Sequence, residues 1–219
     1  MPCNCCEITD NAFSEEEARS ELMRYRKKGP AKQTQLLLNS IRSLQLKNID
    51  LLDIGGGIGV IHHELLEDVA VRATHVDTSS AYLKEARVEA ARRGHETRVD
   101  FIPADFTDIA ADLPKADIVT LDRVVCCYPD FRRLLSAAAE HSRSALAITY
   151  PREVWYIRMG LKIINFFQRL GRDPFRVFLH PVAEMDALLI REGFERVSLR
   201  RLFVWEMALY QRKQVTLSA

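Results

Sequence analysis

The chain has 219 residues, 47% of them hydrophobic and 28% charged, with a formal net charge of +1 at pH 7. This composition is typical of a folded globular protein, and the length fits one α/β domain, which we expect over residues 1–219. A charge so near zero argues against nucleic acid as a partner, because proteins that bind nucleic acid usually carry a basic surplus.

Helical patterns come first along the chain. We expect residues 1–13 to be a flexible tail and residues 14–46 to form two helices. Ser14 and Glu17 make a capping box, in which each side chain bonds to the other residue's backbone, and the first helix should end near Gly29. Pro30 then opens a second helix that runs to about Leu46.

Short apolar runs and amphipathic stretches alternate after these helices. The expected strands cover residues 49–54, 71–76, 98–102, 117–121, 145–149 and two runs within 194–212, and the expected helices cover 58–67, 79–93, 130–141 and 182–192. This alternation predicts a doubly wound, mainly parallel, seven-stranded α/β sheet with helices on both faces.

Residues 152–178 form a helical insertion after the fifth strand. The segment is rich in large apolar side chains such as Trp155, Phe166 and Phe167, for which core packing is the simpler interpretation. The alternative is a lid, because the insertion follows the carboxyl edge of the sheet, where doubly wound folds bind ligands. The same apolar surface fits a homodimer contact as well.

A glycine-rich loop joins the first strand to the following helix, running from Asp53 through Gly55 and Gly57 to Gly59. Glycine lets the backbone turn tightly and lets a ligand approach closely, so the loop indicates a nucleotide-type site. A dinucleotide fingerprint counted from Gly55 requires Gly or Ala where this chain has Val60, which disfavours a nicotinamide cofactor.

Acidic residues end the next two strands. Asp77 is placed to accept hydrogen bonds from both hydroxyls of a ribose, and Asp105 to accept one from an adenine amino group. Together with Asp53 and the glycine loop, this ordered set resembles the class I S-adenosylmethionine-dependent methyltransferases over roughly residues 49–150. A glycine turn with helix-capping acids is the plainer alternative.

That resemblance implies S-adenosylmethionine as the cofactor and assigns roles to particular residues. Asp53 orders the loop or reaches the ammonium group through water. The remaining cofactor-binding candidates are Gly55, Gly57 and Gly59 at the methionine part, Asp77 with the adjacent Thr78 at the ribose, Asp105 and Phe106 at the adenine, and Asp122 near the sulfonium.

The segment after the fourth strand, Leu121 to Asp130, helps to form the acceptor site in this family. Asp122 and Arg123 are the leading candidates for contact with the acceptor, and an ion pair at the sheet edge is the alternative. A hydroxyl or amine acceptor has to lose a proton, which Tyr128 or His180 could take, although His180 before Pro181 also suits a helix entry. A carboxylate acceptor needs only cationic anchoring, by Arg123 and by others such as Arg152 or Arg176.

A closer resemblance involves the insertion and the closing strand pair from Arg196 to Arg212, which are similar to those of magnesium-protoporphyrin O-methyltransferases. That family has His-Tyr where this chain has Cys126 and Cys127, a departure that weakens the case for a porphyrin acceptor. The two thiols are catalytic candidates or small core residues. Tyr25 could cover the cofactor, although helix packing accounts for it equally well.

Two further clusters invite a metal interpretation. His62 and His63 follow the glycine loop, but consecutive helical positions point in different directions, so surface or capping roles are favoured. Cys3, Cys5 and Cys6 form a thiol group without an obvious fourth ligand, and we interpret them as part of a mobile tail. We therefore expect no metal.

The sequence as a whole predicts methyl transfer from S-adenosylmethionine to a small-molecule acceptor by in-line displacement. The alternatives are a sensor or partner protein that binds the cofactor without using it, and an NAD(P)-dependent oxidoreductase. No apolar run approaches the roughly 20 residues of a membrane helix, so we expect a cytoplasmic protein with reduced cysteines and no membrane span.

Overall fold

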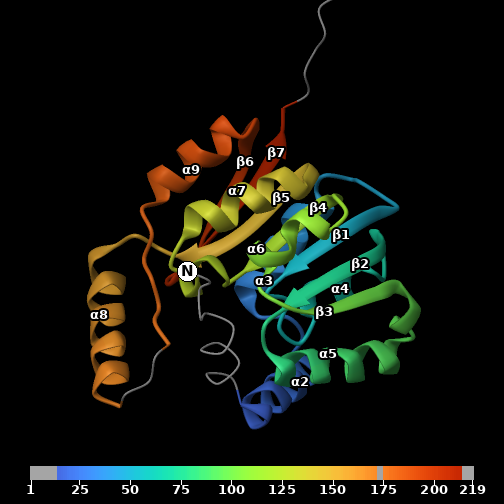
Figure 1. Ribbon diagram of the computed structural model, residues 1–219, viewed down its shortest axis with the longest axis horizontal. Helices are drawn as coiled ribbons and strands as arrows, with labels where there is room; N and C mark the ends of the chain where they lie inside the picture. The colour runs from blue at the N-terminus through green and yellow to red at the C-terminus, as the bar shows by residue number, and fades with distance from the viewer. Residues whose placement is uncertain (1–13, 172–174, 214–219) are drawn as a thin grey trace, which may run out of the picture.

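The computed structural model describes residues 14–171 and 175–213, which build one seven-stranded sheet flanked by helices (Figure 1). The strand order is β3-β2-β1-β4-β5-β7-β6. The strands are β1 (Ile49–Ile54), β2 (Ala70–Asp77), β3 (Val99–Pro103), β4 (Ala116–Asp122), β5 (Ser142–Pro151), β6 (Phe194–Arg201) and β7 (Trp205–Arg212). The helices are α2 (Glu15–Lys28), α3 (Lys32–Arg42), α4 (Val60–Leu65), α5 (Ser80–Arg93), α6 (Phe106–Ile109), α7 (Phe131–His141), α8 (Trp155–Leu170) and α9 (Val182–Arg191).

The first five strands are parallel, and β7 runs antiparallel to both β5 and β6. The strand order reverses at β1: β2 and β3 lie on one side of β1, and β4 and β5 lie on the other. In a doubly wound sheet this reversal leaves a crevice at the carboxyl ends of the strands, where ligands bind. The predicted sheet, its strand number and its mainly parallel direction are confirmed.

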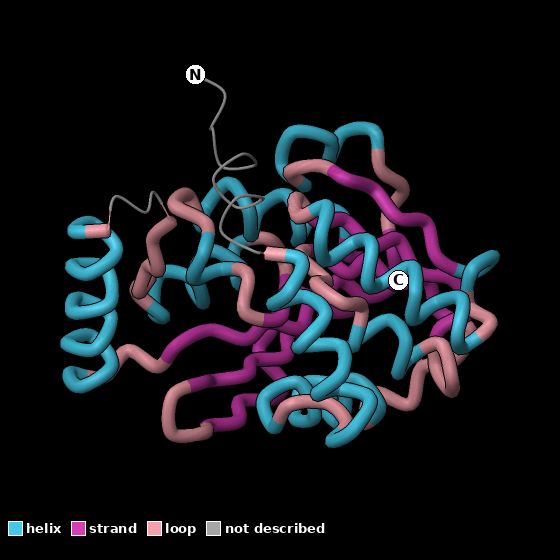
Figure 2. Tube along the Cα trace, turned by 90° about the horizontal axis from the view of Figure 1, so that it is seen from below, coloured by secondary structure: helices cyan, strands magenta, loops and turns pink. Residues whose placement is uncertain are grey.

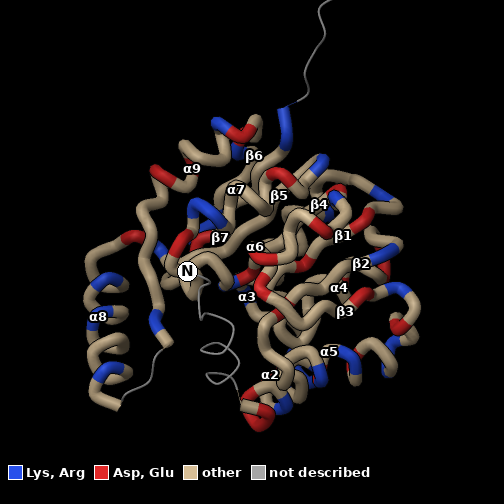
Figure 3. Tube along the Cα trace, viewed as in Figure 1, with Lys and Arg blue, Asp and Glu red and all other residues tan. Residues whose placement is uncertain are grey.

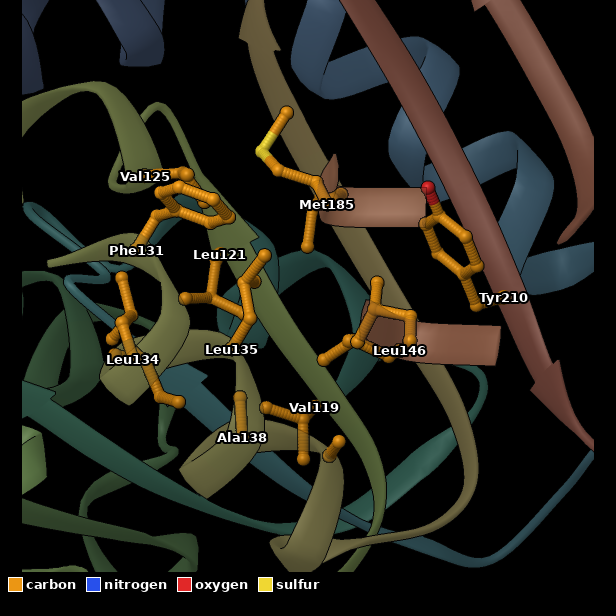
Figure 4. Packing of buried hydrophobic residues seen from close by; sticks show 14 of the residues in the cluster. Val119, Leu121, Val125, Phe131, Leu134, Leu135, Ala138, Leu146, Met185 and Tyr210 are labelled. Carbon is orange, nitrogen blue, oxygen red and sulfur yellow. The ribbon is translucent and has the colours of Figure 1, made fainter. Parts of the chain in front are cut away.

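The central strands are buried on both faces because their side chains alternate between two hydrophobic clusters. In β4, Val119 and Leu121 join one cluster while Ile118 joins the other. Figure 4 shows the first cluster, in which side chains of α7 and Met185 of α9 pack on strand residues such as Leu146. The second cluster contains apolar residues of α3 and α4. Both faces of the sheet are therefore covered, as the apolar runs of the sequence predict.

The N-terminal helices form as expected, with one difference in length. The Ser14 hydroxyl accepts from the Glu17 amide while the Glu17 carboxylate accepts from the Ser14 amide, so the predicted capping box is present. The second helix ends at Arg42 rather than near Leu46. Gln45 and Asn48 adopt left-handed backbone conformations, with φ of 56° and 57°, and turn the chain into β1.

The insertion after β5 corrects the expectation of core packing. Helix α8 contains no buried residue, and its large side chains include Trp155 at 79% and Phe167 at 62% exposure. The helix stands away from the sheet in two perpendicular views (Figures 1 and 2), so only one of its sides faces the rest of the protein. Within the two described ranges, no helix is long and apolar enough to cross a membrane.

Candidate functional site

A cavity of about 630 Å³ lies at the carboxyl edge of the sheet, which is a usual size for a small-molecule site. Its walls come from the loops that follow β1 to β5, from α2 and α5, and from α8 with the chain that follows it. The sequence candidates that line it are Gly55, Gly57, Asp77, Thr78, Asp105, Phe106, Asp122, Arg123 and Tyr128, whereas Asp53, Gly59 and His180 lie outside the lining.

The glycine loop needs its glycines for both backbone conformation and space. Gly55 and Gly57 have φ of 61° and 57°, in the region that favours glycine. A Cβ on Gly55 would lie 2.5 Å from a methyl group of Val124, which belongs to the loop after β4. The loop thus packs closely against the acceptor-side segment and leaves its backbone open to the cavity.

Asp77 ends β2 with its carboxylate fixed by the backbone. One oxygen accepts from the Gly57 amide and the other from the Ser79 amide, both at 2.8 Å. Burial raises the pKa of Asp77 to about 6, although these two hydrogen bonds favour the charged form. The half-buried carboxylate retains acceptor capacity toward the cavity, and it is largely ionised at pH 7.

Asp105 forms a small network with Thr107 and Tyr128 at the next strand end. Its Oδ1 caps α6 by accepting from the Thr107 amide at 2.8 Å. The Tyr128 hydroxyl lies 2.6 Å from Thr107 Oγ1 and 3.2 Å from Asp105 Oδ2. Burial raises the pKa of Tyr128. Asp105, which follows β3, therefore contacts the loop after β4 through the hydroxyl group of Tyr128.

Asp122 ends β4 and Arg123 follows it, and both make more contacts than an isolated ion pair would. The hydroxyl groups of Thr34 and Thr149 each donate a hydrogen bond to a different carboxylate oxygen of Asp122. Arg123, whose φ of 64° is strained for a non-glycine residue, approaches Asp122 at 3.8 Å and bonds to Glu21 at 3.0 Å. The carboxylate of Asp122 is thus held in place, while the guanidinium joins the sheet edge to α2.

Glu21 and Tyr82 are wall residues that sequence reasoning missed. The Tyr82 hydroxyl donates to Glu21 at 2.9 Å, so Glu21 binds both Tyr82 of α5 and Arg123. Glu21 is one of several acids in α2, and nothing in the helical pattern distinguishes it from its neighbours. Tyr25, one turn later, packs between helices and bonds to Glu64 and Arg93 instead of entering the cavity.

Beneath the glycine loop lies a buried histidine cluster, made of His62, His63, His75 and His95. The expectation of surface or capping roles for His62 and His63 was wrong, since both side chains are fully buried. His62 Nδ1 lies 3.1 Å from the buried carboxylate of Asp53, which also accepts from Thr120. Helix α4 begins only after Gly59; the His62 ring packs on His75, and His63 Nδ1 lies 3.2 Å from His95 Nδ1.

This packing explains why Asp53 and Gly59 are absent from the cavity wall. A Cβ on Gly59 would lie 2.4 Å from the His62 ring, so this glycine makes room for the cluster. Burial lowers the pKa of His62 and His75 to about 3 and that of His63 to about 2. Among the described residues, no group of three His, Cys, Asp or Glu side chains is arranged to hold a metal ion.

His180 supports the loop after β4 from outside the cavity. Its Nε2 lies 3.1 Å from the Val125 carbonyl and 2.9 Å from the Tyr128 carbonyl, so this nitrogen is the protonated donor. Burial lowers the pKa of His180, which keeps the ring neutral at pH 7. The imidazole lies between Phe131 and Phe178.

The two thiols after β4 both line the cavity. Cys126 and Cys127 have their sulfur atoms 3.8 Å apart, and each also contacts the Arg123 carbonyl. The hydrogen bond from Cys126 lowers the pKa of the Cys127 thiol. The N-terminal group Cys3, Cys5 and Cys6 lies outside the described residues.

The wall opposite the glycine loop is apolar. It combines Pro151 and Trp205 of the sheet edge with Phe175 and Val177 and with one side of α8. The residues that α8 contributes are Tyr156, Ile157, Gly160, Leu161 and Ile164. One side of the insertion therefore lines the cavity, while a lid stays a prediction; Arg152 and Arg176 lie outside the lining.

Comparisons with known proteins point in one direction. Residues 51–144 match a family model described as a methyltransferase domain. No curated protein sequence matches the chain significantly.

Solved structures extend the likeness to nearly the whole chain. A magnesium protoporphyrin IX methyltransferase from Synechocystis PCC 6803 with bound SAH superposes with a TM-score of 0.72 at 17% identity, covering 95% of this chain and all of that one. A putative sarcosine dimethylglycine methyltransferase from Galdieria sulphuraria gives a TM-score of 0.67 at 11% identity, over 83% of this chain and 86% of its own. An O-methyltransferase family protein from Burkholderia thailandensis gives 0.66 at 17% identity, over 93% of this chain and 64% of its own. At these identities the likeness concerns the fold.

Proposed function

We propose that the chain, whose residues 51–144 match a methyltransferase domain, is a class I, S-adenosylmethionine-dependent methyltransferase that methylates a neutral small molecule with a largely apolar body. The observation that carries the proposal is the composition of one cavity. The glycine loop and the acids at the strand ends lie on one side of it, and the apolar wall made by α8 lies on the other. A cofactor and an acceptor can meet between them.

The first side fits the cofactor. Gly55 and Gly57 leave backbone space for the methionine part, and Asp77 offers an ionised carboxylate to the ribose hydroxyls. We assign Asp105 and Phe106 to the adenine and Thr78, beside Asp77, to the ribose, since all of them line the cavity. When bound, the cofactor supplies an activated methyl group, so the protein's task is to hold an acceptor in line and to exclude water.

The second side favours an apolar acceptor. Ile157, Leu161 and Ile164 present aliphatic side chains toward the cavity, and Phe175 and Trp205 add aromatic surface. Burying such surface against an apolar ligand contributes roughly 25 cal/mol per Å². Gly160 leaves room beside the helix, since no atom outside its own helix lies within 4 Å of the position a Cβ would occupy.

Charge decides between a neutral acceptor and a carboxylate. The wall carries the carboxylates of Glu21, Asp77, Asp105 and Asp122 against the single guanidinium of Arg123. This negative balance suits a cationic sulfonium but opposes a second anion. Arg123 is already paired with Glu21, so a carboxylate acceptor would have to displace that partner.

A neutral hydroxyl or amine has to release a proton, and Tyr128 is the candidate we retain for that role. Tyr128 lines the cavity and its hydroxyl is hydrogen-bonded to Thr107 and Asp105, so it can give its own proton to the Asp105 carboxylate while it takes the proton of the acceptor. Asp122 is less suited as the proton acceptor because each of its carboxylate oxygens already accepts a hydrogen bond from a threonine hydroxyl. We assign His180 the role of a positioning residue that holds the loop carrying Tyr128.

A matched set of acceptors tests this proposal. The protein would be incubated with radiolabelled S-adenosylmethionine and aromatic compounds of one scaffold that bear a hydroxyl, an amine or a carboxylate, and methylated products would be counted. We expect transfer to the hydroxyl or amine members and little to the carboxylates. Preferential methylation of the carboxylates would contradict the charge argument. A variant with Leu161→Asp should lose transfer, because it places a charge on the apolar wall.

A further inference from the structure

Helix α8 presents a second, outward apolar surface that the cavity does not use. Five side chains recur every three or four residues along it and form one stripe, since such spacing keeps residues on one face of a helix. We call this stripe the outer face of α8. Its residues and their exposed fractions are Trp155 79%, Met159 53%, Ile163 51%, Phe166 61% and Leu170 72%.

Basic residues border the outer face. Helix α8 carries Arg158, Lys162 and Arg169 and no acidic residue, and at about 100° of rotation per residue all three fall beside the apolar stripe. Figure 3 shows the Lys and Arg positions spaced along the whole helix. Arg158 pairs with Glu153, whereas Lys162 and Arg169 have no acidic partner among the described residues.

The neighbouring hairpin extends the apolar surface. Phe203, in the turn between β6 and β7, is 75% exposed and stacks on Tyr156 of α8 with ring centroids 5.2 Å apart. Trp155 packs edge-on against the same tyrosine. Large side chains at such exposure, gathered on one surface, indicate a contact with something else.

We propose that the outer face of α8 docks onto an anionic lipid bilayer, with the helix lying in the plane of the membrane interface. An amphipathic helix with Trp, Phe and Leu on one face and only Lys and Arg as its charges has the composition of interfacial helices. The aromatic side chains enter the boundary between headgroups and acyl chains, and Lys162 and Arg169 face the anionic headgroups. With 16 residues, α8 is too short to span the bilayer.

Charge also distinguishes the bilayer from a second copy of this chain. In a two-fold contact through the outer face, each α8 helix would meet a second α8 that has no acidic side chain to complement its basic border. An anionic membrane instead complements both the apolar stripe and its border. This inference does not depend on the proposed function, because the residues that line the cavity lie on a different side of the helix.

Vesicle co-sedimentation of the full chain tests the proposal. The protein would be mixed with vesicles of phosphatidylcholine alone and of phosphatidylcholine with phosphatidylglycerol. We expect strong binding to the anionic vesicles only. The double variant Lys162→Gln and Arg169→Gln should bind the anionic vesicles about thirtyfold more weakly, since each basic residue near the membrane surface contributes ~1 kcal/mol. The control pair Lys27→Gln and Lys47→Gln changes two exposed lysines elsewhere and should leave binding unchanged.

Two further variants separate the apolar contribution from the charge. Phe166→Ser should reduce binding, whereas Met23→Ser, at a residue 62% exposed on α2, should not. The chain has two tryptophans, so a blue shift of fluorescence on anionic vesicles that is lost in Trp155→Phe would place Trp155 in the lipid. Absence of vesicle binding, or binding that ignores all outer-face variants, would overturn the proposal. A dimer in solution that Phe166→Ser disperses, without vesicle binding, would make this face a subunit contact and overturn it too.

Discussion

Asp77 meets the cavity with its carboxylate held between the amides of Gly57 and Ser79. These contacts orient the group before any ligand arrives, so little rearrangement is needed on binding. Burial nevertheless raises its pKa to about 6, close to physiological pH. Ligand recognition at this carboxylate is therefore expected to be sensitive to pH.

That sensitivity gives a direct prediction for cofactor binding. Lowering the pH from 7 to 5 protonates Asp77 and removes an acceptor for the ribose hydroxyls, so the dissociation constant of S-adenosylmethionine should rise by about tenfold. Isothermal titration calorimetry at several pH values measures the change. Asp77→Asn should bind weakly with no such slope, and an equal slope in that variant would assign the effect to another group.

Tyr128 offers a second test at the scale of a single atom. Tyr128→Phe removes the hydroxyl that bonds to Thr107 and Asp105, while the ring keeps its place in the wall. We expect kcat to fall at least tenfold, a typical loss for a proton-transfer group, with S-adenosylmethionine affinity changed less than threefold. Comparable losses in affinity and kcat would indicate that the hydroxyl supports the cofactor instead.

Residues of the cavity wall were predictable from the sequence where acidic residues or glycines lie at the carboxyl end of a parallel strand. Asp77, Asp105, Gly55 and Gly57 line the cavity because parallel strands end at one edge and the left-handed loop conformation favours glycine. The burial of both His62 and His63 was not predictable from their spacing, because it depends on tertiary packing. His62 packs against His75 of β2, while His63 contacts α5 at the Ala86 carbonyl, so helix α4 is covered on both sides.

Gly59, where the glycine loop enters α4, packs against the buried histidine cluster beneath that loop. Gly59→Ala should destabilise the protein by about 2–4 kcal/mol, because the new methyl group adds left-handed strain and also meets the His62 ring. Gly94→Ala provides the matched control, with φ of 72° but open space around its Cβ position, and should cost only about 1 kcal/mol. Urea denaturation measures both values, and equal losses would refute the packing argument.

Helix α2 closes one wall of the cavity through Glu21. Glu21→Gln weakens the contacts with Arg123 and Tyr82, so we expect a three- to tenfold higher dissociation constant for S-adenosylmethionine, as for the loss of a half-buried ion pair. Glu16→Gln, at an exposed position of the same helix, should have no effect. An unchanged dissociation constant in Glu21→Gln would show that α2 does not contribute to binding.

Helix α8 shows the limit of predicting burial from apolar content. Its large side chains predict burial, yet they lie on two surfaces, one lining the cavity and one exposed. Hydrophobic content alone does not distinguish a core from a ligand wall or a docking surface. The strands of the sheet were easier to predict, since continuous apolar runs bounded by glycine or acids are typical of buried parallel strands.

For the whole molecule, the buried histidines make stability depend on pH. His62, His63 and His75 have pKa values of about 3, 2 and 3 in the folded protein, below the usual 6.5. Unfolding therefore takes up protons below pH 6.5, and stability falls as the pH decreases, by about 1.4 kcal/mol per pH unit for each histidine. The raised pKa of Asp77 opposes this trend between pH 6 and 4.

His75 provides the test of that dependence. Neither of its ring nitrogens has a hydrogen-bond partner in the described part of the chain, so His75→Leu should preserve stability at pH 7. The slope of unfolding free energy against pH below 6 should decrease by about one proton. Urea denaturation across this range measures it, and a slope parallel to the wild type would contradict a neutral buried His75.

Cofactor choice is the central claim, and thermal denaturation with added ligands tests it most directly. At 100 times its dissociation constant a ligand adds about 2.7 kcal/mol, which raises Tm visibly. We predict a rise with S-adenosylmethionine and S-adenosylhomocysteine, none with NAD or NADP, loss of the rise in Asp77→Ala, and its retention in Asp100→Ala, at an exposed position of β3. A rise with NAD or NADP alone would contradict the account.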